Sequence, residues 1–134
     1  MGERTMIRHL AAVLAADVVG YSRLMGADEV DTVTRLKAIH TDVLDPLIRE
    51  HDGAVITTAG DGLIVTFGSA TTAVDCAVRI QEMLVQRQPD VSDDRRMLLR
   101  VGVNLGDLIY DDHDGVHGDG INIAARRRNG SAVR

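Results

Sequence analysis

The sequence has 134 residues, of which 45% are hydrophobic and 26% charged, and its formal net charge is −5 at pH 7. This length suits one domain with an ordinary hydrophobic core, and an acidic surface argues against nucleic-acid binding as the main function. No apolar run is long enough to span a membrane. The apolar run before Asp17 favours a buried strand over a signal peptide, so a cytoplasmic location is expected by default.

The N-terminal third predicts a buried strand followed by a helix. Residues 7–16 form a continuous apolar run, which is typical of a strand buried on both faces. Apolar residues then recur at spacings of three and four over residues 27–44, which predicts a helix with Asp28 as its N-cap. Pro46 is expected to interrupt this helix, with Asp45 as the N-cap of a short second helix.

The middle of the chain predicts a hairpin and a second long helix. Residues 54–58 and 63–67 are apolar strands joined by Ala59-Gly60-Asp61-Gly62, and an Asp-Gly pair between apolar runs is a strong hairpin signal. Ser69 is the expected N-cap of a helix that runs to about Gln88. The apolar side of this helix is predicted to consist of Ala70, Ala73, Val74, Ala77, Val78, Leu84 and Val85.

The last third predicts a polar loop over residues 90–96 and a strand over residues 98–104 that turns at Gly106-Asp107. Residues 108–110 would return as a short partner, and residues 120–128 would start a final helix. The order strand, helix, strand, strand, helix, strand is the ferredoxin-like βαββαβ arrangement. The expected fold is therefore α+β, with an antiparallel sheet and helices on one face.

Two aspartates are candidate metal ligands. Asp17 ends an apolar strand, where a carboxylate is costly unless it is paired or metal-bound, although a turn or cap role explains it equally well. Asp61 alone is explained by hairpin chemistry. In a ferredoxin-like sheet, however, the end of the first strand can meet the hairpin tip, and two carboxylates there repel unless a cation separates them. Mg²⁺ prefers such a pair together with substrate phosphates. Replacing either aspartate by Ala should spare or raise the stability of the metal-free fold, because it relieves the repulsion between the two carboxylates.

Two further segments could contact a nucleotide. Gly20-Tyr21-Ser22 precedes the first helix, and its backbone N–H groups could cradle phosphates. Asn122 and Arg126 are four residues apart and therefore share one face of the last predicted helix. This pair either contacts a sugar and a phosphate or forms a solvated basic helix end.

Three segments in a fixed order resemble the class III adenylate/guanylate cyclase catalytic domain in its bacterial homodimeric form. They are Ala15-Ala16-Asp17-Val18-Val19-Gly20-Tyr21-Ser22, Thr58-Ala59-Gly60-Asp61-Gly62 and Gly118-Asp119-Gly120-Ile121-Asn122-Ile123-Ala124-Ala125-Arg126. The resemblance covers residues 6–128. Because the family domain normally continues beyond this point, the domain is expected to be incomplete at its C-terminus, with residues 129–134 as a disordered tail.

The resemblance implies a nucleotide cyclase that converts ATP to cyclic AMP and pyrophosphate in intracellular signal transduction, by in-line displacement with two metal ions, Mg²⁺ or Mn²⁺. Asp17, Val18 and Asp61 would hold the metals, and Gly20-Tyr21-Ser22 would bind substrate. Asn122 and Arg126 would act from the opposite subunit of a homodimer. The alternative is a catalytically impaired module that serves for dimerisation or nucleotide binding.

This chain departs from the family at the positions that recognise the base. Thr57 replaces the usual Lys and Gly115 the usual Asp or Thr, and the guanine-reading Glu and Cys are also absent. Lys37 is the only lysine, so the lysine that the family supplies to the phosphates from its C-terminal part is missing. A site with few hydrogen-bonding groups discriminates weakly, so only a slight preference for ATP over GTP is expected.

Overall fold

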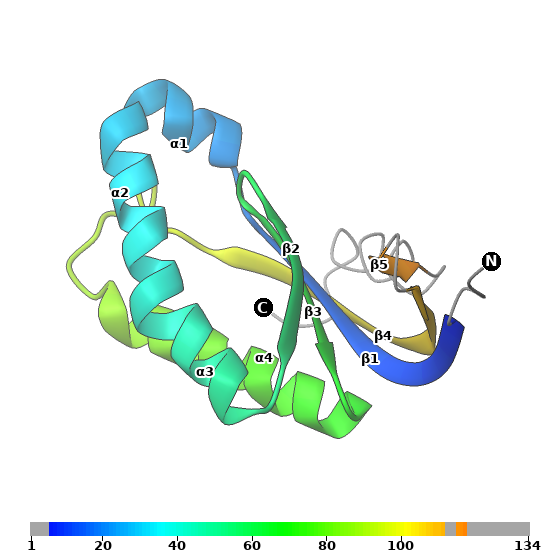
Figure 1. Ribbon diagram of the computed structural model, residues 1–134. Helices are drawn as coiled ribbons and strands as arrows, with labels where there is room; N and C mark the ends of the chain where they lie inside the picture. The colour runs from blue at the N-terminus through cyan, green and yellow to red at the C-terminus, as the bar shows by residue number, and fades with distance from the viewer. Residues whose placement is uncertain (1–5, 112–114, 118–134) are drawn as a thin grey trace.

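An antiparallel sheet organises the computed structural model, which describes residues 6–111 and 115–117 (Figure 1). Within these residues the strands lie in the order β2-β3-β1-β4-β5. The strands are β1 (Met6–Val18), β2 (Ala54–Ala59), β3 (Gly62–Phe67), β4 (Leu99–Asp111) and β5 (Gly115–His117). The helices are α1 (Tyr21–Ala27), α2 (Glu29–Ile39), the π-helix η1 (His40–Leu44), α3 (Asp45–Glu50) and α4 (Ala70–Arg87).

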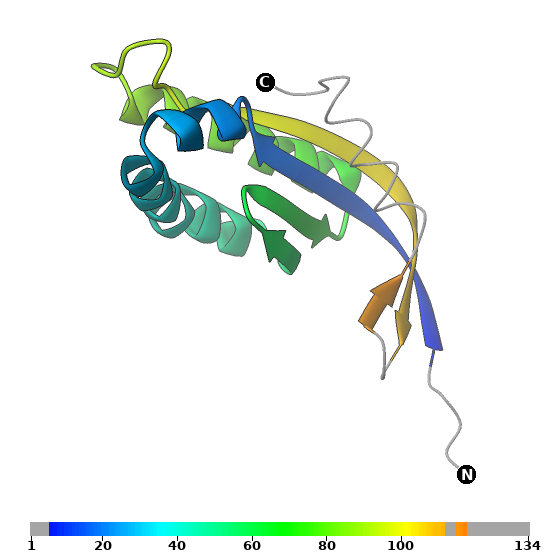
Figure 2. The ribbon, with the colours of Figure 1, turned by 90° about the horizontal axis from the view of Figure 1, so that it is seen from above.

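The predicted α+β fold is confirmed. β1 pairs antiparallel with both β3 and β4, and β2 pairs antiparallel with β3, which is the ferredoxin-like strand arrangement. The main hydrophobic core joins residues of all the helices to one face of the sheet. Seen from above, β1 and β4 run side by side and extend past the helices toward β5 (Figure 2).

Burial on both faces of β1 explains its unbroken apolar sequence. Ala12, Leu14, Ala16 and Val18 belong to the core beneath the helices. The alternate residues Ala11, Val13 and Ala15 belong to a second buried cluster, whose other members, Ile64, Leu108 and the partly buried Ile56, also come from strands. Successive side chains of a strand point to opposite faces. A strand that is buried on both faces therefore has apolar residues at every position rather than at alternate positions. The prediction of a doubly buried strand is confirmed for residues 11–16, whereas Leu10 is exposed.

Asp28 links two helices. Its side chain accepts a hydrogen bond from the Asp31 N–H at 3.0 Å, so the predicted N-cap is confirmed for α2. The same residue ends α1, the short helix over Tyr21–Ala27 that the sequence analysis did not predict. A seven-residue segment is too short to show a helical period clearly.

Pro46 does not interrupt the helix, contrary to the prediction. Asp45 has helical backbone angles (φ −60°, ψ −47°), and its N–H donates to the His40 carbonyl in the π-helical turn η1, so it is not an N-cap. Proline lacks an N–H and clashes with the carbonyl four residues earlier in a regular helix. A wider π turn immediately before Pro46 keeps the chain helical around this defect.

The N-cap of α4 is confirmed, but its apolar face is rotated from the predicted one. The Ser69 hydroxyl accepts a hydrogen bond from the Thr72 N–H at 3.1 Å. Val74, Val78 and Val85 are 40%, 41% and 66% exposed. The buried side consists of Ala73, Cys76, Ala77, Ile80 and Leu84, whose spacing gives one stripe on the helix. No helix in the described residues combines the length and hydrophobicity that crossing a membrane requires.

β4 continues through Gly106 and Asp107, so the predicted turn is wrong. Gly106 pairs with Ala11 and Asp107 pairs with Leu10, and the ladder extends to Asp111. β1 offers a partner for each of these residues, and this pairing outweighs the local turn preference of a Gly-Asp sequence. Residues 108–110 are thus the far part of β4, and its short antiparallel partner is β5.

Gly53 gives a stability prediction. A Cβ at Gly53 would lie 2.7 Å from Phe67 Cε1 and 2.9 Å from Ile48 Cγ2. Because both neighbours are buried, we expect Gly53→Ala to lower the free energy of unfolding by about 1–3 kcal/mol in urea denaturation. The control is Gly26→Ala in α1, where nothing lies within 4 Å of the added atom, and it should raise stability by about 0.5–1 kcal/mol. Equal effects of the two variants would contradict this packing.

Candidate functional site

Asp17 is a strand residue whose side chain is on the sheet face opposite the helices. It pairs in register with Arg100 of β4, one residue before the end of β1. Its side chain shares the face of Ala15, because residues two apart in a strand point to the same side. Asp17 is only 9% exposed. The turn or cap interpretation is therefore wrong, and the sequence instead buries a carboxylate within a sheet.

Arg100 compensates this carboxylate. Its Nε donates to Asp17 Oδ1 at 2.9 Å and its Nη2 donates to Oδ2 at 3.1 Å. This two-point contact matches the planar guanidinium to the carboxylate and is among the stronger ion pairs in proteins. The hydrogen bond to Asp17 raises the pKa of Arg100, and the negative charges of Asp17 and Asp61 add to the effect.

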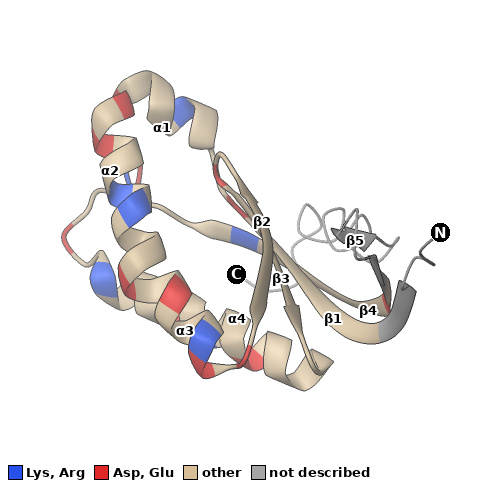
Figure 3. Cartoon of the chain, in the orientation of Figure 1, with Lys and Arg blue, Asp and Glu red and all other residues tan. Residues whose placement is uncertain are grey.

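Asp61 meets the end of β1, as predicted. It follows Gly60, which has a φ of 57°, in the two-residue turn between β2 and β3. A glycine with positive φ is typical of the first position in the type II′ hairpin turn. Asp61 Oδ2 accepts a hydrogen bond from the Val18 N–H at 3.0 Å. Figure 3 shows an acidic tip on this hairpin and a basic segment in β4, on a sheet that otherwise carries little charge.

The expectation that an alanine at either aspartate would spare or raise stability is not supported by this geometry. It assumed two repelling carboxylates. In the structure a guanidinium holds Asp17, and a backbone N–H holds Asp61. Removing either side chain would leave the Val18 N–H or the half-buried Arg100 guanidinium without its acceptor, which lowers stability.

The remaining predicted residues occupy separate positions. Gly20-Tyr21-Ser22 connects β1 to α1, and Gly20 adopts a left-handed conformation (φ 65°, ψ 33°) at the helix start. Thr57 is exposed in β2 and Gly115 lies in β5. Since β2 and β5 are the two edge strands of the described sheet, Thr57 and Gly115 are not cross-strand neighbours. Asn122 and Arg126, the predicted final helix and the predicted tail lie outside the described residues.

The donor set fits a hard divalent cation. In residues 6–111 and 115–117, no group of three or more His, Cys, Asp and Glu side chains is arranged to hold a metal. The available ligands are the carboxylates of Asp17 and Asp61, and Asp61 uses one oxygen for the Val18 N–H. Mg²⁺ binds through one or two carboxylates and takes other oxygens from water and phosphates. A cation at Asp17 would have to replace at least part of the Arg100 contact.

Arg100 is the residue that sequence reasoning missed. In the sequence it is one of several arginines after α4 and carries no motif of its own. Only the register of β1 against β4 places it opposite Asp17. A cross-strand charge pair of this kind can be predicted only when the exact first and last residues of both strands are known.

The chain is similar to known proteins over most of its length. The family model described as "Adenylate and Guanylate cyclase catalytic domain" matches residues 8–131. A protein of Rhizobium meliloti (strain 1021), provisionally named adenylate cyclase 3, is 50% identical over 126 residues, which are 94% of this chain and 21% of that protein. The chain therefore spans about a fifth of that relative's length.

Solved structures show the same fold. An adenylate/guanylate cyclase/hydrolase from Silicibacter pomeroyi is 38% identical with a TM-score of 0.86, covering 95% of this chain and 73% of that one. The adenylyl cyclase CyaB from P. aeruginosa, at 20% identity and a TM-score of 0.78, covers 96% of this chain and 76% of that one. The second likeness concerns the fold alone.

The ion pair between Asp17 and Arg100 can be measured by a double-mutant cycle. With Asp17→Asn, Arg100→Gln and the double variant, urea unfolding should give a coupling energy of about 1–2 kcal/mol, because the pair is bidentate and half-buried. The matched control is Arg79→Gln with Glu82→Gln, an exposed pair at 3.2 Å that should couple by less than about 0.5 kcal/mol. Equal coupling in the two cycles would show that the bidentate pair contributes no more than a surface contact.

Proposed function

Because this chain belongs to the adenylate and guanylate cyclase catalytic domain family, we propose that it converts ATP to cyclic AMP and pyrophosphate. Family membership supports a nucleotide cyclase, and the choice of ATP is the proposal. The observation that carries the proposed cyclase activity is the meeting of β1 with the β2–β3 hairpin. There, Asp61 accepts a hydrogen bond from the Val18 N–H, next to Asp17. This places two carboxylates at one end of the sheet, where two ions of Mg²⁺ or Mn²⁺ would bind.

Asp17, Asp61 and the Val18 backbone would hold the metals, which the family generally uses. Bound divalent ions supply the positive charge that lowers the pKa of the ribose 3′-hydroxyl and neutralises the triphosphate. The protein contributes a fixed geometry, because Asp17 is anchored in a strand and the Val18 N–H orients the Asp61 carboxylate. Such preorganised groups need not reorient as charge develops on the reacting phosphate.

Arg100 would act as a counter-ion when no metal is bound. It neutralises a carboxylate that would otherwise be buried with its full charge. A divalent cation then competes with the guanidinium for the Asp17 oxygens, and the two positive charges repel. Arg100 is thus expected to weaken metal binding in the absence of nucleotide.

Gly20-Tyr21-Ser22 would bind the phosphates, since it follows directly from the strand end that carries Asp17. Asn122 and Arg126 would contact the ribose and the transition-state phosphate from a second subunit, so the proposed enzyme is a homodimer. Exposed apolar side chains on the projecting part of the β1–β4 ladder support association. Leu10 is 58% exposed and Leu105 is 51% exposed, and the register places both on one face.

The alternative is a module that binds nucleotide or dimerises without efficient turnover. Thr57 and Gly115 favour it, because neither side chain supplies the charged group that the family uses for base recognition. For either function we propose a cytoplasmic location, where nucleoside triphosphates are available.

Product formation tests the proposed function. Purified chain with ATP and Mn²⁺ should form cyclic AMP, and Asp17→Asn or Asp61→Asn should lower the rate at least about 100-fold by removing a metal ligand. Asp75→Asn on the exposed side of α4 is the matched control and should leave the rate unchanged. Metal-dependent nucleotide binding without product would favour the non-catalytic module. Product formation that is insensitive to both aspartates would contradict the assigned site.

Base selectivity tests the substrate. The ratio of kcat/KM for ATP over GTP should be about tenfold or less, because Thr57 and Gly115 offer few groups that distinguish the bases. Thr57→Lys should raise this ratio, whereas Thr58→Lys should not, since adjacent strand residues point to opposite faces. A hundredfold preference in the unmodified chain would mean that other residues recognise the base.

A further inference from the structure

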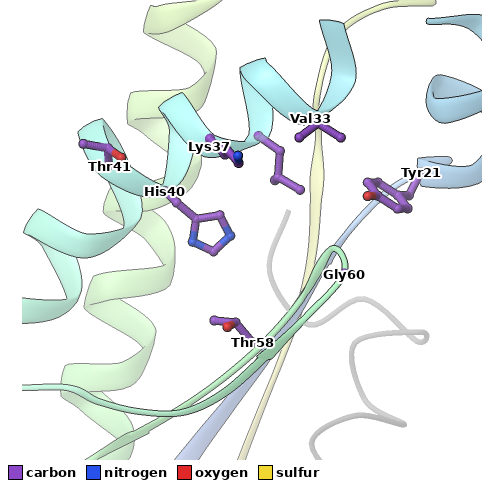
Figure 4. Close-up of a pocket in the computed structure, with 8 residues that line it drawn as sticks. Tyr21, Val33, Lys37, His40, Thr41, Thr58 and Gly60 are labelled. Carbon is purple, nitrogen blue, oxygen red and sulfur yellow. The ribbon is translucent and has the colours of Figure 1, made fainter. Parts of the chain in front are cut away.

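A pocket lies between α2 and the β2–β3 hairpin, on the helix side of the sheet. Its volume is about 420 Å³, which is within the range of small-molecule sites. Figure 4 shows the side chains that line it, which come from α1, α2, η1 and β2. The lining residues are Tyr21, Val33, Leu36, Lys37, His40, Thr41, Thr58 and Gly60.

The polar groups of this pocket favour an anion. Lys37 and His40 lie one helical turn apart, and neither side chain makes a hydrogen bond or ion pair within the described residues. His40 and Thr58 point toward one another across the pocket (Figure 4). Among the described residues that line it, none carries a carboxylate. Arginines of this acidic chain commonly pair with aspartates, as Arg87 does with Asp42. The Lys37 side chain has no such partner in the described residues, so it gives the pocket a positive potential.

The walls favour an apolar or aromatic body beside that anionic group. Tyr21, Val33 and Leu36 supply a ring and two branched aliphatic side chains. Leu36 is buried in the main core, and Tyr21 packs against the same core, so these walls are rigid. A cavity with apolar walls and a few convergent polar groups is the usual form of a small-molecule site.

We propose that this pocket binds a small organic anion, an aromatic or apolar body with one carboxylate or phosphate that contacts Lys37. The hydroxyl of Thr58, which His40 faces across the pocket, would lie near the head group. This site differs from the aspartate pair, because the pocket opens on the helix side whereas Asp17 faces the other side of the sheet. The two are neighbours through the chain, since Tyr21 follows Gly20 and Gly60 precedes Asp61.

Binding can be tested without turnover by titrating ¹⁵N-labelled chain in EDTA and following amide shifts. Benzoate and phenyl phosphate should shift the amides of Lys37, Thr41 and Thr58, and the tighter of the two identifies the preferred head group. Benzyl alcohol, which has the ring alone, and inorganic phosphate, which has the charge alone, should each bind at least about tenfold more weakly.

Variants locate the site. Lys37→Gln should weaken binding of the better probe about tenfold, the loss typical of one charge-assisted hydrogen bond. Arg79→Gln, which removes an exposed charge from α4, should change nothing. Asp17→Asn should also leave the affinity unchanged. Unchanged affinity in Lys37→Gln, benzyl alcohol binding as tightly as benzoate, or shifts centred on Asp17 would each overturn the proposal. None of these outcomes bears on cyclic AMP formation, so the two proposals can fail separately.

Discussion

The register of β1 against β4 is the constraint on which the structure depends. The ladder runs without a break from the pair Met6–Asp111 to the pair Val18–Leu99. It decides which residues of β1 enter the core beneath the helices and which enter the strand-only cluster on the other face. The same register places Arg100 beside Asp17. A slip of one residue would turn every side chain of β1 to the opposite face, so core and site are specified together.

Much of the fold was predictable from local patterns. The apolar run before Asp17, the Asp-Gly hairpin and the Ser69 cap each have a strong local cause, and each was confirmed. The predicted turn in the last third failed for a different reason, which is that long-range pairing overrode a local preference. Gly106-Asp107 would turn in isolation, but β1 holds it in an extended strand. The meeting of Asp61 with the end of β1 followed from topology, whereas the role of Arg100 required the exact register.

One strand serves two opposed requirements. β1 must be apolar to fill both faces of the sheet, yet it also positions a carboxylate at its end. A guanidinium binds Asp17 in this environment, and the neighbouring Val18 N–H donates a hydrogen bond to Asp61. The transition from core to site takes place within two residues. This short distance joins the proposed metal ligands directly to the buried residues of β1.

The π-helical turn at His40–Leu44 has a consequence for how this segment tolerates insertions and deletions. A π turn holds more residues than an α turn, so deleting one residue here would restore a regular α-helix. The π turn accommodates its extra residue within the turn, so this deletion would leave Leu47 and Ile48 on nearly the same, buried face of α3. Pro46 would then meet a regular α-helical ladder, in which its ring clashes with the carbonyl four residues earlier. The wide turn is therefore required by Pro46 rather than by the packing of α3.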